Sequence, residues 1–264
     1  MIQTLPVLLY HSVTDSPARG FEKFTVHPDQ FESHLDHLLD DDRLVMPLGR
    51  LAAHISTGTP LPEGAMAVTF DDGLADFAHH AWPLLRARDL PATLYTVAGY
   101  MGDQSRWLPG EAGRMRMLGA DELTALADDG VEIGAHSMTH PQLDLVPLDR
   151  ARREIVESKD VLEQVLGRPV TSFAYPHGHH TRAIKDLVSG AGYTSAAAVR
   201  NMLSHERDDV FALARLTVTD AVSETDIGRL LQGRGARRAP RHQLLRTRAG
   251  RQVRRLRERS GRTR

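Results

Sequence analysis

Residues 66–73 read Met-Ala-Val-Thr-Phe-Asp-Asp-Gly, an apolar run that stops at two adjacent acids. A short apolar run between polar segments predicts a buried strand. The pair Asp-Gly is common in turns, but two acids placed directly after an apolar strand are less typical of a plain turn. We therefore expect a strand at 66–70 whose carboxyl end presents Asp71 and Asp72 to a functional site.

On both sides of this segment, short apolar runs alternate with amphipathic ones. We expect further strands at 6–10, 43–46, 92–97, 131–135, 170–175, 194–199 and 213–218. We expect helices at 28–39, 48–55, 74–88, 121–129, 148–166, 181–189 and 224–231, the third kinked at Pro83. Strands that alternate with helices are typical of an α/β fold with a parallel sheet. A closed or nearly closed (β/α) barrel fits this length best, and a doubly wound open sheet is the alternative.

Composition and charge narrow the class of protein. Of the 264 residues 41% are hydrophobic, which is enough for a sizeable core and excludes a disordered or fibrous protein. There is no cysteine, so any metal must be bound by His, Asp or Glu. The net charge of −1 hides an asymmetry, because residues 229–264 hold 14 arginines and one acid. We expect a catalytic body at 1–228 and an arginine-rich tail at 229–264 that is flexible or partly helical.

The same features bear on location and partners. A membrane-spanning helix needs about 20 mostly apolar residues, and no segment qualifies. The N-terminus lacks the basic start and long apolar stretch of a secretory signal, so we expect a cytoplasmic protein. The tail is a candidate for contact with an anionic membrane surface or another acidic partner. Specific nucleic-acid binding is not expected, because the body is acidic and offers no basic groove.

Polar side chains follow four of the expected strands where each strand ends. These are His11 after 6–10, Asp71 and Asp72 after 66–70, His136 and His140 after 131–135, and Tyr175, Pro176 and His177 after 170–174. In a parallel barrel the carboxyl ends of the strands share one face, and that face holds the active site. We therefore expect these four clusters to converge.

The spacing of His136 and His140 is compatible with a metal site. Two imidazoles at i and i+4 can reach one ion from a single turn, although such a pair in a chain with 14 histidines can also be a solvated turn. A carboxylate on the same face would complete a two-histidine, one-carboxylate set that leaves positions open for water and substrate. Asp71 and Asp72 leave an extended backbone in opposite directions, so one can face the ion and the other the substrate water.

In this order, the motifs resemble the polysaccharide deacetylase family, the carbohydrate esterases with a NodB-type domain. Residues 69–73 (Thr-Phe-Asp-Asp-Gly) resemble its first motif, 136–140 (His-Ser-x-x-His) its second and 173–178 (Phe-Ala-Tyr-Pro-x-Gly) its third. Segments 9–13 (Leu-Tyr-His-Ser-Val), 91–94, 130–134 and 191–193 also match, so the resemblance spans about 6–218. It implies a distorted (β/α) barrel of about seven strands. It also implies metal-dependent removal of an N-acetyl group from an acetamido sugar, in a glycoside, glycolipid precursor or oligosaccharide.

The resemblance also implies roles, carried over by position. Asp71 would be the general base, and Asp72, His136 and His140 would bind one divalent ion, with Zn²⁺ expected and Co²⁺ or Ni²⁺ as alternatives. The backbone N–H of Tyr175 would help hold the oxyanion. The family's late catalytic histidine is missing. The chain resembles the branch of the family with an N-terminal Tyr-His-Ser-Val segment and a Phe-x-Tyr-Pro-x-Gly third motif, and this resemblance implies that the histidine comes from the first strand. His11 is therefore the candidate general acid, with a pKa near the ordinary value of about 6.5.

A second departure concerns the base. The third motif usually begins with an arginine that steadies the base aspartate, and residues 172–175 (Ser-Phe-Ala-Tyr) contain none, so Arg215 is the candidate substitute. Trp107, Pro176, His177 and Arg215 are candidate substrate contacts. Two alternatives stay open, a catalytically inactive carbohydrate-binding relative and a deacylase of a non-sugar acylated metabolite.

Overall fold

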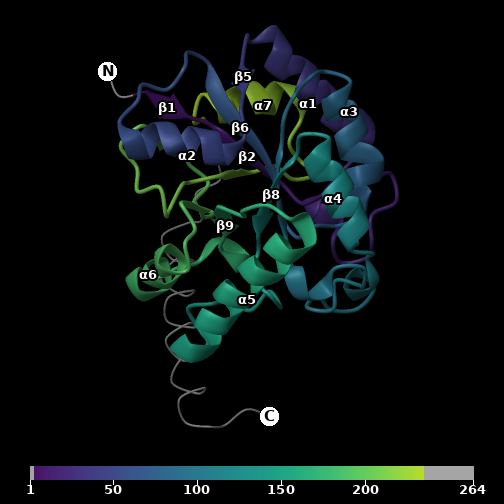
Figure 1. The fold of residues 1–264 in the computed structure, drawn as a ribbon. Coiled ribbons are helices and arrows are strands. Elements are labelled where there is room, and N and C mark those ends of the chain that lie inside the picture. The colour runs from purple at the N-terminus through teal and green to yellow at the C-terminus, as the bar shows by residue number, and fades with distance from the viewer. Residues whose placement is uncertain (1–2, 235–264) are drawn as a thin grey trace, which may run out of the picture.

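Eight parallel strands form the central sheet of the computed structural model, which describes residues 3–234 (Figure 1). Seven of them follow the order β10-β9-β8-β7-β6-β2-β12, and β5 pairs with β6 beside this path. The strands are β2 (Val7–Tyr10), β5 (Leu44–Val45), β6 (Ala65–Phe70), β7 (Thr93–Thr96), β8 (Glu132–Ala135), β9 (Ser172–Ala174), β10 (Ser195–Ala197) and β12 (Leu216–Thr217).

The sheet curls into a distorted barrel, as predicted. Its two ends are linked by one segment, because Leu213 exchanges backbone hydrogen bonds with Ala196 and Ala198 of the β10 region before the chain enters β12. The distortion is visible at β6, where β5 pairs with the first half of the strand and β7 with the second half. The doubly wound open sheet is therefore excluded.

Seven α-helices lie around the sheet in the described part of the chain. They are α1 (Pro28–Asp40), α2 (Leu48–Thr57), α3 (Trp82–Arg86), α4 (Ala120–Asp128), α5 (Leu148–Leu166), α6 (Arg182–Gly190) and α7 (Glu224–Leu231). Most pack an apolar face against the outside of the sheet, as α1 does with Phe31 and Leu35. Helix α2 differs, because its Leu48 and Leu51 share a core cluster with Val7, Ala67 and Tyr95 of the strands.

The expected helix at 74–88 is different in the structure. Residues Phe77–Ala81 (η2) form a π-helical turn, and only Trp82–Arg86 is α-helical. Pro83 lies in the first turn of α3, where a residue without an N–H is tolerated, so the irregular turn precedes the proline. Helix α4 starts one residue before the expected position 121. It begins after Gly119, whose N–H donates to Glu122 at 2.9 Å.

Four short strands were not predicted. β1 (Thr4–Leu5) pairs antiparallel with β11 (Ser204–His205), and β3 (Ser12–Val13) pairs in parallel with β4 (Thr25–Val26). The 3₁₀ turn η1 (Glu22–Phe24) directly precedes β4, and its Phe24 ring lies 5.1 Å between centroids from the ring of His11, the residue after β2.

The expected boundary at residue 228 falls inside helix α7. Helix α7 continues to Leu231, and its Leu230 and Leu231 are buried in the core. The rest of the expected tail, residues 235–264, lies outside the described residues. Within 3–234, none of the helices combines the length and the apolar character needed to cross a bilayer.

Candidate active site

The carboxyl ends of β2, β6, β8 and β9 bring the candidate residues to one face of the barrel. Asp71, Asp72, His136 and His140 are all buried there. The backbones of Asp72, Ser137, His140 and His177 have positive φ angles between 59° and 75°. Such left-handed conformations cost on the order of 1–3 kcal/mol each for residues other than glycine and tend to cluster at functional sites.

Asp72, His136 and His140 form a compact donor cluster. One ligand atom from each residue lies within 4.8 Å of those from the other two. Nε2 of His140 lies 3.4 Å and Nε2 of His136 lies 3.8 Å from Oδ1 of Asp72. Nδ1 of His136 donates to the carbonyl of Ala174 at 2.8 Å, which leaves the Nε2 lone pair free to bind a metal.

The charges of this cluster fit a divalent cation. Burial lowers the pKa of His136 and of His140, so both rings are in the neutral, metal-binding form. Burial and the neighbouring Asp71 raise the pKa of Asp72 well above its usual range. Among residues 3–234, Oδ1 of Asp72 lies close to the two neutral imidazoles but forms no ion pair with an arginine or a lysine. A bound cation would supply the positive charge that the Asp72 carboxylate lacks.

Asp71 is held by Arg215 through two hydrogen bonds. Nη1 donates to Oδ1 at 2.6 Å and Nη2 to Oδ2 at 2.7 Å, and both side chains are buried. Burial alone would raise the pKa of Asp71, but Arg215 and then His136 more than offset this, so the pKa is lowered. The structure therefore places an arginine beside the candidate base, and its fully buried guanidinium offers no surface for a substrate.

A side chain of α5 holds the loop that carries the two histidines through hydrogen bonds. The Glu154 carboxylate accepts hydrogen bonds from the N–H groups of Met138 and Thr139, at 3.1 and 2.8 Å, and from the Thr139 hydroxyl at 2.6 Å. Within the loop, the His140 N–H donates to Oγ of Ser137 at 3.0 Å. Sequence analysis missed Glu154, although a signal existed. It lies on the same helical stripe as the buried Ala151, Ile155, Ser158 and Leu162.

His11 lies near this cluster but differs from expectation in its pKa. Its ring is half-buried, lies 5.1 Å from the Phe24 ring between centroids, and has no hydrogen-bond partner at Nδ1 among the described residues. Burial lowers its pKa to about 4, against the ordinary value that we expected. The ring is therefore neutral in the free protein at pH 7.

The N–H of Tyr175, which we expected to help hold the oxyanion, already has a hydrogen-bond partner in the structure. It donates to the carbonyl of Ala197 at 3.0 Å as part of the β9–β10 pairing, and the Tyr175 hydroxyl donates to the carbonyl of Phe211 at 2.9 Å. The role of oxyanion donor is thus not open to this N–H in the structure. The next residue, Pro176, is buried as well.

Two further candidates flank His140. The Trp107 ring stacks on the imidazole with centroids 5.0 Å apart, and the exposed His177 ring meets it edge-on at 4.8 Å. Trp107 also packs against Tyr100 within the long segment 99–119. The Trp107 and His177 rings thus lie beside the donor cluster, in contact with one of its histidines.

Comparisons of the sequence with known proteins point to one family. The family model described as polysaccharide deacetylase matches residues 58–196. YxkH of Bacillus subtilis (strain 168), a protein classed with the polysaccharide deacetylases, is 21% identical over 86% of this chain and 76% of its own length. The poly-β-1,6-N-acetyl-D-glucosamine N-deacetylase of Staphylococcus aureus (strain MRSA252) is 20% identical over 79% of this chain and 73% of its own length.

Solved structures show the same fold. The Streptococcus pyogenes deacetylase PplD in complex with acetate superposes with a TM-score of 0.76 and 21% identity, covering 88% of this chain and 99% of that one. IcaB from Ammonifex degensii gives 0.75 and 22%, covering 87% and 97%. At these identities the likeness concerns the fold.

Proposed function

Because the chain belongs to the polysaccharide deacetylase family, we propose that it is a metal-dependent hydrolase that removes the N-acetyl group from an acetamido sugar. One observation carries the proposal. A buried set of one carboxylate and two neutral imidazoles lies beside a second carboxylate, Asp71, that Arg215 keeps ionised. This arrangement suits hydrolysis of an amide, which needs an activated water, a polarised carbonyl and a protonated leaving amine.

In this proposal Asp72, His136 and His140 hold one divalent ion, with Zn²⁺ expected and Co²⁺ or Ni²⁺ as alternatives. When bound, such an ion makes water more acidic and polarises a carbonyl. Asp71 accepts the proton of the attacking water at its carboxylate. Arg215 orients that carboxylate and keeps its pKa low, so the base is ready at neutral pH.

The departing amine needs a proton, and His11 is the candidate to deliver it. Because burial lowers its pKa to about 4, the resting ring carries no spare proton. His11 would therefore receive the proton that Asp71 removes from the attacking water and pass it to the amine nitrogen as the C–N bond breaks. The Tyr175 N–H is given no role here, since it is used in the sheet.

The choice of an acetamido sugar rests on relatives. The S. aureus relative is named for the deacetylation of poly-β-1,6-N-acetyl-D-glucosamine, which favours a sugar amide over a non-sugar acyl group. Against an inactive binding protein stands the presence of Asp71, Asp72, His136 and His140 in one buried cluster.

The test is acetate release from a panel of N-acetylated sugars, from monosaccharide glycosides to oligomers, with metal-loaded and chelator-treated protein. We expect release only from the loaded protein. Asp71→Asn should abolish turnover and keep the metal, whereas Asp72→Ala should lose the metal, as measured by elemental analysis. Full activity in either variant would refute these roles. Absence of release from every sugar by metal-loaded protein would refute the proposed function.

A further inference from the structure

A carboxylate that none of the roles above uses lies in the segment that follows the two candidate acids. Asp76 comes four residues after Asp72, directly before the π-helical turn η2, and is half-buried. Burial raises the pKa of Asp76 to about 7, so the ionised form is costly at this position. Its Oδ1 atom is buried and has no hydrogen-bond partner among residues 3–234. A buried polar group of this kind calls for an explanation beyond packing.

The hydrogen bonds of Asp76 hold the short strand β3 against this turn. The Ser12 hydroxyl donates to Oδ2 of Asp76, which lies 64 residues further along the sequence. The backbone N–H groups of Val13 and Phe77 also donate to the Asp76 carboxylate. Val13 belongs to β3 and Phe77 begins η2, so one carboxylate joins the strand to the turn.

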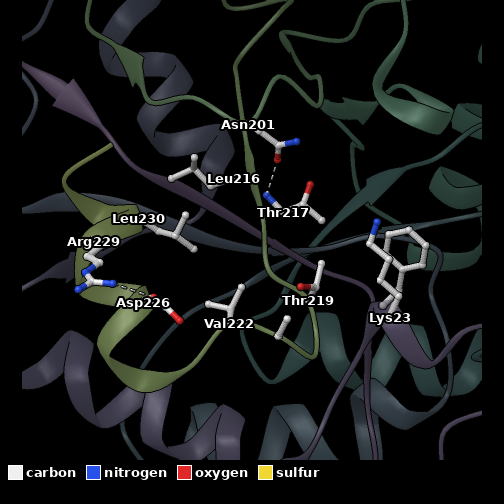
Figure 2. Close-up of a pocket in the computed structure, with 11 residues that line it drawn as sticks. Lys23, Asn201, Leu216, Thr217, Thr219, Val222, Asp226, Arg229 and Leu230 are labelled. Carbon is white, nitrogen blue, oxygen red and sulfur yellow. Dashed lines mark hydrogen bonds and ion pairs between the residues drawn. The ribbon is translucent and has the colours of Figure 1, made fainter. Parts of the chain in front are cut away.

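The residue directly before β3 is His11, the candidate general acid. Its backbone is held by β2 on one side and by Ser12 on the other. The His11 ring packs against Phe21 and Phe24, with centroids 6.2 and 5.1 Å apart. Phe24 in turn borders a cavity of about 440 Å³ beside β12 and α7 (Figure 2). Because Phe24 can yield toward this cavity, packing against it does not by itself fix the His11 ring.

We propose that Asp76 and Ser12 are positioning residues for the candidate general acid His11. The inference rests on the proposed function. Asp71, Asp72 and Asp76 belong to one continuous segment, so the bond from Ser12 to Asp76 sets the place of His11 relative to the base and the donor cluster. No bond to carbon forms or breaks at Asp76. The proton of the attacking water passes to Asp71, then to His11 and then to the leaving nitrogen.

The leaving group separates positioning of His11 from a general loss of structure. An amide releases its amine only when the nitrogen is protonated, whereas 4-nitrophenyl acetate releases a phenolate that needs no proton. With metal-loaded protein, we expect Asp76→Ala to lower kcat for an N-acetylated sugar about 100-fold, with KM little changed, and kcat for the ester by about threefold at most. Asp15→Ala, at an exposed position three residues beyond Ser12, is the matched control and should leave both rates unchanged.

Further variants test the path from Asp76 to His11. Asp76→Asn keeps one oxygen that can accept from Ser12, so it should recover part of the loss. Ser12→Ala should act in the same direction as Asp76→Ala but more weakly, and it carries the test if Asp76→Ala does not fold. Adding Asp76→Ala to His11→Ala should lower amide turnover no further, because the two changes remove one function. An equal loss for amide and ester, or a further loss in the double variant, would overturn the assignment.

An NMR titration of the His11 ring in metal-free protein gives a readout that does not depend on turnover. Burial lowers the pKa of His11 to about 4 in the wild type. Release of the segment in Asp76→Ala should admit water to the ring, so the pKa should rise toward the ordinary value of about 6.5. Removal of a negative charge alone would lower it, and Asp15→Ala should leave it unchanged.

The two readouts keep this inference separate from the proposed function. A His11 pKa that is unchanged or lower in Asp76→Ala would refute the positioning role. If the pKa rises as expected but the wild type releases acetate from no sugar, the proposed function fails and the anchoring of His11 by Asp76 stands.

Discussion

At the scale of single residues, the Arg215–Asp71 pair has a testable effect on pH dependence. Arg215 lowers the pKa of Asp71, and a base is active only above its pKa. Arg215→Lys keeps the charge but loses the two-point contact, so the pKa of Asp71 should rise. The acid limb of the kcat/KM profile should then move to higher pH, with kcat lowered. An acid limb that stays in place in Arg215→Lys would contradict this coupling.

The same pair contributes to stability. Arg215→Met should destabilise the protein by about 3–5 kcal/mol, because it leaves the buried Asp71 carboxylate without its partner.

At the scale of elements, helix α5 sets the shape of the histidine loop through one carboxylate. Glu154 receives three hydrogen bonds from Met138 and Thr139, between the two candidate ligands. Outer groups that orient metal ligands typically contribute about 10–100-fold in affinity. We predict that Glu154→Ala weakens Zn²⁺ binding by that factor, measured by competition with a chelating dye. Glu157→Ala, at an exposed position of the same helix, is the control, and equal affinities in the two variants would refute the role.

A helix or strand could be predicted when the residues that define its bounds lie within or next to it in the sequence. Helices α5 and α7 have the predicted bounds because an amphipathic period coincides with local end signals, a left-handed Gly167 and a Ser223 capping box. Strands β1, β3, β4 and β11 have two residues each and are defined only by their distant partners. They lie outside the apolar runs that predicted the other strands, so the sequence offered no signal for them.

At the scale of the whole molecule, the site also combines features that the local sequence predicts with contacts that only distant partners fix. The donor cluster followed from the rule that parallel strands end on one face, which needs only the order of strands. The contact between Arg215 and Asp71 spans 144 residues and depends on how β12 closes the sheet. Likewise, the Tyr175 N–H is used because β10 pairs with β9 at that register. These contacts depend on barrel closure and register, which local patterns do not determine. Arg215 was predicted as the partner of Asp71 only because the family resemblance called for an arginine there, not because of a local pattern.

The burial of neutral histidines makes the stability of the whole protein depend on pH. His34 is fully buried, accepts a hydrogen bond from the Tyr10 hydroxyl at 3.1 Å and donates to the Val222 carbonyl at 2.8 Å. Burial lowers its pKa to about 4, whereas an unfolded histidine has a pKa of about 6.5. Between these values the unfolded chain binds more protons, so the free energy of unfolding falls as pH decreases from 6.5 to 4. The loss from this residue is up to about 3 kcal/mol, and it is absent above pH 6.5.

Urea unfolding of metal-free protein at several pH values measures the contribution of His34 to the free energy of unfolding. We expect His34→Gln to be less stable than the wild type at pH 7, because the buried hydrogen bonds are disturbed. Its free energy of unfolding should nevertheless fall less steeply between pH 6.5 and 4, because one titrating group is gone. His79→Gln, at an exposed position, should retain the wild-type slope. Equal slopes in His34→Gln and wild type would show that His34 does not contribute to acid unfolding.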